Sequence, residues 1–150
     1  MAIPPPVRIA LGSDEATPLT DALLDRLAER GCSVERFGAV LDGGNDWPAI
    51  GRAVGEAVQS GRAERGVVCC WTGTGVSIAA NKVPGVRAAL CCDADTARGA
   101  RRWNDANVLA LSLRATSIPI AVEILDAFLD TPPTADAAER DAIAAIEPIG

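Results

Sequence analysis

The stretch Val67–Lys82 places the strongest constraint on what this chain can fold into. It opens with an apolar, β-branched run, Val67–Cys70, which is typical of a buried strand. It then turns at Gly73 and Gly75 and continues as a helical segment over about 76–82. A strand, a glycine turn and a helix in this order form anion sites in α/β proteins, because backbone N–H groups and the positive end of the helix dipole converge there.

A thiol lies at the rim of this predicted anion site, because Cys70 is the last residue of the apolar run. A helix N-terminus stabilises the thiolate form of a nearby cysteine. Such a thiolate can abstract a proton, and the N–H groups beside it can hold the oxyanion that results. Cys70 is therefore a candidate catalytic base. The alternative is that it is a small buried apolar side chain, as free cysteines often are.

Strand-like and helix-like segments alternate along the whole chain. Besides Val67–Cys70, the expected strands are Val7–Leu11, Ser33–Phe37, Arg87–Cys91 and Val108–Leu111. Helices are expected before Gly31, over about 49–59, from Asp93 onward, over 118–129 and over 135–146, with Thr17 and Ser117 as caps. This alternation predicts one α/β domain over residues 1–150, a Rossmann-like three-layer sandwich with a five-stranded, mainly parallel sheet.

The composition excludes several classes of function. With a net charge of −6 and no long apolar run, the chain is not expected to bind nucleic acid or a membrane. Met1–Pro6 lacks the basic and apolar regions of a signal peptide, so we expect a cytoplasmic protein with reduced cysteines. The chain has no histidine, which excludes every mechanism that needs an imidazole from this chain.

Four cysteines in the pairs Cys69-Cys70 and Cys91-Cys92 raise the alternative of a zinc site. Neighbouring residues in a strand point to opposite faces of the sheet, so these sulfur atoms cannot easily converge. The spacing also lacks the C-x-x-C pattern of zinc ribbons. We therefore expect no metal ion and no other cofactor.

Three blocks of the sequence resemble one known family. They are Val7–Asp14, with the sequence VRIALGSD, Thr72–Leu90, which opens with TGTGVSIAANK, and Asn104–Leu111, with the sequence NDANVLAL. The blocks are long and in order, and the similarity runs from about Val7 to Leu129. On these motifs the chain resembles the ribose-5-phosphate isomerase B and galactose-6-phosphate isomerase family. The resemblance implies a homodimer or a tetramer whose site is built from two chains.

The resemblance also implies an aldose–ketose isomerase that moves a proton between adjacent carbons of an open-chain sugar through a cis-enediol. Cys70 would be the base, Thr72 would assist proton transfer at the sugar oxygens, and Asp14 would contact substrate hydroxyls. For Thr72 and Asp14 the alternatives are a turn hydroxyl and a helix-capping carboxylate. The residues expected to bind the substrate are Asp14, Glu15, Trp47, Trp71, Gly73, Thr74, Gly75, Trp103, Asn104 and Arg114.

The chain departs from the family pattern mainly at positions that would hold a phosphate. Glu15 and Trp103 stand where the family has histidines, Trp71 where it has glycine, and Trp47 where it has tyrosine. Residues 135–138 read ADAA where the family has Gly-Gly-Arg-His, and Arg114 is the cationic position that clearly remains. A phosphate needs several charge-assisted hydrogen bonds, each worth about 1.5–3 kcal/mol.

The sequence therefore favours an isomerase or epimerase that acts on a non-phosphorylated or atypical sugar. Two alternatives stay open. The chain is a non-catalytic family member that serves as a binding or partner subunit, or it is a ribose-5-phosphate isomerase. The expected partners are a small-molecule substrate and a second copy of the chain.

Overall fold

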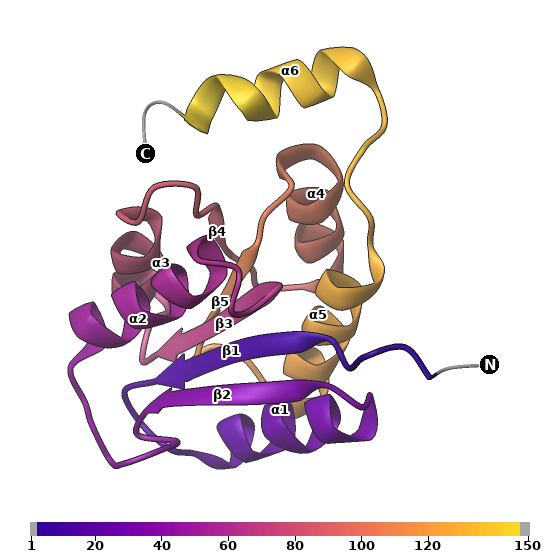
Figure 1. Ribbon diagram of the computed structural model, residues 1–150. Coiled ribbons are helices and arrows are strands. Elements are labelled where there is room, and N and C mark those ends of the chain that lie inside the picture. The colour runs from indigo at the N-terminus through magenta and orange to yellow at the C-terminus, as the bar shows by residue number, and fades with distance from the viewer. Residues whose placement is uncertain (1–2, 148–150) are drawn as a thin grey trace.

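A parallel five-stranded sheet lies at the centre of the computed structural model, which describes residues 3–147 (Figure 1). The strands are β1 (Arg8–Ser13), β2 (Ser33–Gly38), β3 (Arg65–Cys70), β4 (Ala88–Leu90) and β5 (Val108–Ser112), in the spatial order β2-β1-β3-β5-β4. The helices are α1 (Pro18–Glu29), α2 (Trp47–Gln59), α3 (Thr74–Asn81), α4 (Ala94–Asn104), α5 (Ile118–Asp130) and α6 (Ala137–Ile146). Within residues 3–147 no helix has the length and apolar character that crossing a membrane requires.

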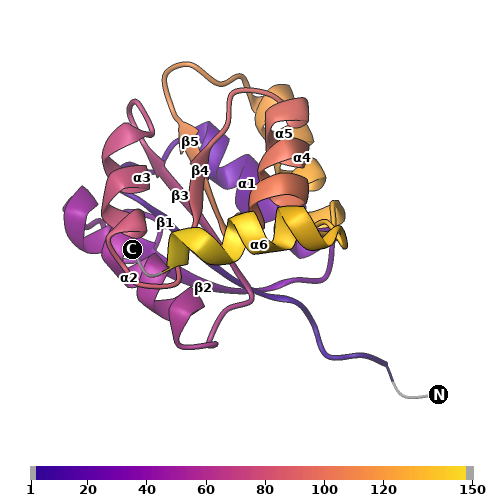
Figure 2. The same ribbon diagram turned by 90° about the horizontal axis from the view of Figure 1, so that it is seen from above.

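Side-chain alternation along the strands divides the interior into two cores. Figure 2 shows α2 and α3 on one side of the sheet and α1, α4 and α5 on the other. Ile9, Leu11, Val67 and Cys69 belong to the core under α1, α4 and α5. Ala10, Val68 and Cys70 belong to the core under α2 and α3. The predicted Rossmann-like α/β sandwich is confirmed, and Cys69 and Cys70 face opposite ways as strand geometry requires.

Capping residues fix where several helices begin. The Thr17 hydroxyl accepts a hydrogen bond from the N–H of Thr20, whose own hydroxyl accepts from the N–H of Thr17. Ser117 caps α5 by accepting from the third helical N–H, so both predicted caps are confirmed. Asp46 accepts from the N–H of Ala49, so α2 begins at Trp47, slightly before the predicted start near residue 49.

Small residues bring α2 and α3 close together. A Cβ on Gly51 would lie 2.7 Å from the Cβ of Ala79, and a Cβ on Gly55 would lie 2.9 Å from the Val83 side chain. Real Cβ atoms do not approach this closely, so a larger residue at either position would push the two helices apart. The close packing sets the start of α2 beside the start of α3.

The edge strand β4 is shorter than the predicted Arg87–Cys91. At its start the N–H of Arg87 donates to the side chain of Asn107 at 2.7 Å. On its outer side the Asn81 side chain accepts from the N–H of Ala88 at 2.7 Å and donates to the carbonyl of the same residue at 3.0 Å. The Asn107 amide thus takes a hydrogen bond that a longer ladder with β5 would use, and the Asn81 amide satisfies backbone groups on the open edge. Figure 1 shows α6 set apart from the sheet and beside α4.

Candidate active site

The carboxyl ends of β1 and β3 meet the start of α2 at one pocket. This cavity of about 290 Å³ is lined by Asp14, Trp47, Cys70, Trp71, Thr72, Thr74 and Gly75. Every one of these residues is among those that the sequence predicted for the site. They come from the loop after β1, the first residue of α2, the last residue of β3, the turn after it and the first two residues of α3. Open parallel sheets bind ligands at this edge.

Cys70 ends β3 with its side chain on the α2 and α3 side of the sheet. It is 6% exposed and lines the pocket, so a ligand there reaches it from solvent. Cys69 faces the other core and is fully buried, and this burial raises the pKa of its thiol to about 12. Cys69 therefore stays protonated at neutral pH. Of the two neighbouring thiols, only Cys70 is placed to meet a ligand.

The turn that follows Cys70 requires glycine at two positions. Gly73 has a φ of +77° in the left-handed region and is the N-cap of α3. Among the residues that the structure describes, no side chain caps this helix, so its first N–H groups are open to a ligand. A Cβ on Gly75 would lie 2.9 Å from the indole ring of Trp47, so this ring packs against the start of α3 as a wall of the pocket.

Two hydroxyl groups lie together at the pocket. The Oγ1 atoms of Thr72 and Thr74 are 2.8 Å apart, which is an O–H···O hydrogen bond with either atom as donor. Both side chains are exposed to solvent. The Thr72 hydroxyl can therefore give or take a proton at a bound ligand while Thr74 holds its orientation.

The two acidic residues after β1 differ in their position relative to the pocket. Asp14 lines the pocket, and its pKa is raised chiefly by burial and further by the charge of Glu15, against a hydrogen bond from its own backbone that lowers it. Glu15 is exposed and is not among the lining residues. Its N–H and carbonyl both bond the Ser13 hydroxyl, which fixes the turn.

A second cavity of about 380 Å³ adjoins the first, and Thr72 lines both. It is lined by Thr72, Leu90, Cys91, Cys92, Ser112, Arg114, Ala115 and Thr116. The backbone N–H of Arg114 donates to the carbonyl of Trp71 at 3.0 Å, which holds the main chain at the predicted cation beside the turn that follows Cys70. The sequence interpretation missed Ser112 and Cys92. Ser112 ends β5 and Cys92 follows β4, and this position at the same carboxyl edge was the signal that could have found them.

Trp103 and Asn104 are not brought to this pocket within one chain. They end α4 and precede β5, whereas Cys70 pairs with Ser112 at the far end of β5. Four residue steps of strand separate Val108 from Ser112, or about 13 Å. Trp103 is 54% exposed and packs against the Arg102 guanidinium, and Asn104 lines a different cavity beside β4.

Residues 3–147 contain no group of three His, Cys, Asp or Glu side chains that could hold a metal ion. All five cysteines are free. Cys91 is buried and Cys92 is exposed, and both follow the end of β4 at Leu90.

Comparison with known proteins gives the family. Residues 9–146 match the model of the ribose/galactose isomerase family. The chain belongs to this family. The match reaches through α6, further than the similarity that the sequence motifs indicated, which ended near Leu129.

Individual members of the ribose/galactose isomerase family resemble the chain over most of its length. D-Erythrulose-4-phosphate isomerase from Pectobacterium atrosepticum is 38% identical, with 81% of this chain and 82% of that protein covered. Ribose-5-phosphate isomerase B from Escherichia coli is 37% identical, with 81% and 83% covered. The structure of ribose-5-phosphate isomerase B from Clostridium thermocellum matches with a TM-score of 0.89 and 40% identity, over 95% of this chain and 97% of that one.

Proposed function

We propose that this family member isomerises or epimerises a small open-chain sugar with Cys70 as the catalytic base. The observation that carries the proposal is the pocket itself. It joins the Cys70 thiol, the hydroxyl pair of Thr72 and Thr74 and the uncapped start of α3. These are the groups needed to remove a proton from carbon, to move a proton between oxygens and to stabilise an oxyanion.

The reaction begins when the Cys70 thiolate takes a proton from the carbon next to the substrate carbonyl. The electron pair of the broken C–H bond forms the C=C bond of an enediolate, and the carbonyl oxygen becomes negative near the N–H groups of α3. The Thr72 hydroxyl passes a proton from one substrate oxygen to the other. Cys70 then returns its proton to the adjacent carbon, which exchanges aldose for ketose and restores the thiolate.

The charge around Cys70 argues for a non-phosphorylated or atypical substrate. Among the described residues that line its pocket, Asp14 is a carboxylic acid and none is a cation. Arg114 lies in the adjoining cavity on the other side of Thr72. The compared relatives are named for erythrulose 4-phosphate and ribose 5-phosphate, which supports a polyhydroxy carbonyl compound as substrate.

Ribose 5-phosphate should bind weakly. One guanidinium next to an acidic pocket leaves most phosphate oxygens without a charged donor. We therefore expect a Kd near 1 mM or weaker, which corresponds to a binding free energy of about −4 kcal/mol. Isothermal titration calorimetry measures this directly. Arg114→Gln should weaken binding further, whereas exposed Arg98→Gln should not change it. A micromolar Kd would favour the alternative of a ribose-5-phosphate isomerase.

A second candidate function is that of a non-catalytic partner subunit. One relative that is 39% identical over 123 residues is named as a subunit, the galactose-6-phosphate isomerase subunit LacB from Clostridium acetobutylicum. In such a role the Cys70 thiol would need no activation. Its reactivity therefore separates the two candidates.

Iodoacetamide at pH 7 should alkylate Cys70 faster than Cys92. Cys92 is exposed and Cys70 is 6% exposed, so access alone predicts the reverse order. A cysteine that serves as the catalytic base has to react as a thiolate, so the proposed enzyme reverses this order. Peptide mass spectrometry measures both rates in one sample. Slower alkylation of Cys70 would support the non-catalytic role.

We also propose that the protein is a homodimer. Trp103 and Asn104 cannot meet Cys70 of their own chain, but a second copy could bring them there. Several elements around the β4 edge expose apolar side chains, namely Ile78 of α3, Leu90 of β4, Trp103 of α4 and Ile146 of α6. Several large apolar side chains left exposed near one edge of a sheet favour an interface there.

Light scattering at micromolar concentration should give twice the 15.4 kDa mass of one chain. Trp103→Glu should shift the population toward the monomer, because it places a charge on the proposed interface. Val7→Glu, at an exposed apolar residue away from this edge, is the control and should remain dimeric. A monomeric mass for the unmodified protein would contradict the proposed dimer.

A further inference from the structure

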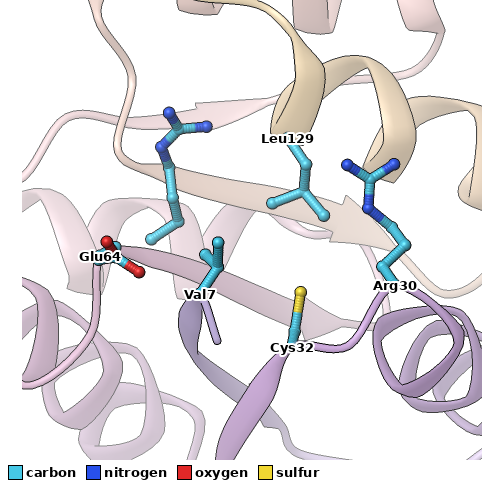
Figure 3. Close-up of a pocket in the computed structure, with 6 residues that line it drawn as sticks. Val7, Arg30, Cys32, Glu64 and Leu129 are labelled. Carbon is cyan, nitrogen blue, oxygen red and sulfur yellow. The ribbon is translucent and has the colours of Figure 1, made fainter. Parts of the chain in front are cut away.

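A separate cavity of about 210 Å³ opens at the amino edge of the sheet, opposite the edge that carries Cys70. It is lined by Val7, Arg30, Cys32, Glu64, Arg65 and Leu129. Val7 precedes β1, Cys32 precedes β2 and Arg65 opens β3, so three strand starts meet here. Figure 3 shows the Cys32 sulfur pointing toward Leu129, with Arg30 at one end of the cavity and Glu64 at the other.

Arg65 carries a positive charge that no direct ion pair offsets within residues 3–147. Its guanidinium donates to the carbonyl of Phe128 at 2.9 Å and lies 5.5 Å from the centre of that ring. None of the ion pairs among residues 3–147 includes Arg65. Burial and the neighbouring charge of Arg101 lower its pKa to about 10, against the more distant charges of Asp105 and Glu64, which raise it. A partly buried guanidinium without a directly paired carboxylate is costly, and an anion would offset that cost.

The other charged groups of the cavity already have partners. Arg30 pairs with Asp126 at 3.1 Å and also with Asp130. Glu64 accepts a hydrogen bond from the backbone N–H of Arg8 at 2.9 Å, although it keeps its negative charge and acts on Arg65 from beyond ion-pair distance. Burial raises the pKa of the Cys32 thiol, so it stays protonated and does not compete as an anion. Arg65 is therefore the group in this cavity that a ligand would pair with.

We propose that this cavity binds a small organic carboxylate, with its carboxylate group on Arg65 and a short carbon chain against Val7 and Leu129. The volume lies below the roughly 300–1,000 Å³ of pockets for drug-sized ligands, so the ligand has few heavy atoms. Guanidinium groups bind carboxylates through paired, charge-assisted hydrogen bonds. Val7 and Leu129 supply apolar surface that a bare inorganic anion would not use. The site is distinct from the Cys70 pocket and does not depend on the proposed isomerase activity.

The test uses Cys32 as the reporter of occupancy. Its alkylation in the full-length chain is followed by peptide mass spectrometry in sodium butyrate and in sodium chloride of equal ionic strength. Butyrate at about twice its Kd fills roughly two thirds of the sites, so Cys32 should react about threefold more slowly. Sodium phosphate at equal ionic strength should protect Cys32 less than butyrate does. Cys70 and Cys92 report in the same sample on binding elsewhere.

Variants identify the group that holds the carboxylate. Arg65→Gln should lose the protection of Cys32. Arg62→Gln should keep it, because the Arg62 side chain is 58% exposed and does not line the cavity. Equal protection by chloride, protection that survives Arg65→Gln, or slowing of Cys70 in place of Cys32 would each overturn the proposal. If Arg65→Gln does not fold, the unmodified chain still decides, because an unprotected Cys32 in butyrate rejects the site.

Discussion

Cys70→Ser should abolish turnover of the sugar substrate while leaving the fold intact. The serine hydroxyl is nearly isosteric with the thiol, so packing at the end of β3 changes little. It is a far weaker acid than a thiol and the chain has no histidine to activate it, so it cannot serve as the base. Loss of a positioned base lowers kcat by about 10²–10⁴-fold. Steady-state kinetics and the melting temperature of the variant measure the two effects separately.

Cys69→Ser is the matched control for this variant. Cys69 is fully buried in the core on the opposite face of the sheet. A hydroxyl without a partner there should cost about 1–3 kcal/mol of folding free energy, while kcat stays unchanged below the melting temperature. Serine at 70 that remains active, or serine at 69 that is inactive with an unchanged melting temperature, would show that Cys70 is not the base.

Gly73→Ala should reduce both stability and activity. Gly73 has a φ of +77°, and a side chain in the left-handed region costs about 1–2 kcal/mol. The new Cβ would also lie 2.9 Å from the carbonyl carbon of Leu111, which is backbone and cannot rotate away. Relief of this contact displaces the turn, and with it the N–H groups at the start of α3. We expect kcat to fall by about 10²–10³-fold, as when an oxyanion donor is lost.

Gly61→Ala separates strain from crowding in this experiment. Gly61 has a similar φ of +81°, but no heavy atom among the described residues lies within 4 Å of the position of its Cβ. It should therefore show the strain alone and keep full activity. Urea unfolding of the two variants gives the difference in free energy. Equal urea midpoints of unfolding for the two variants would mean that the backbone of Leu111 moves aside with no loss of stability, and would contradict the prediction.

Local signals in the sequence predicted much of the fold. Thr17 and Ser117 were identified as caps, because a hydroxyl before a helical run bonds the N–H groups of the first turn. The opposite orientation of Cys69 and Cys70 follows from the alternation of side chains in a strand. The grouping of residues around Cys70 is also local, because most of the residues that line the pocket directly follow the end of one strand.

Features set by distant contacts were not predictable. α3 begins at Thr74, before the predicted residue 76, because its N-cap is a left-handed glycine and carries no side-chain signal. The separation of Trp103 and Asn104 from Cys70 depends on the direction of α4, which returns to the amino edge of the sheet. The cavity at the amino edge of the sheet combines Cys32, Arg65 and Leu129 from distant parts of the chain, and no local pattern links them.

The Asn81 amide bears on how a second copy of the chain can associate. Exposed edge strands recruit further strands through their unpaired backbone groups, and β4 is such an edge. The outward N–H and carbonyl of Ala88 are already bonded by Asn81, so a strand from another molecule finds both occupied. The sheet therefore resists growth by strand addition at Ala88. A partner that meets this edge cannot use the backbone groups of Ala88, so it has to rely more on side-chain packing than a strand at a fully open edge would.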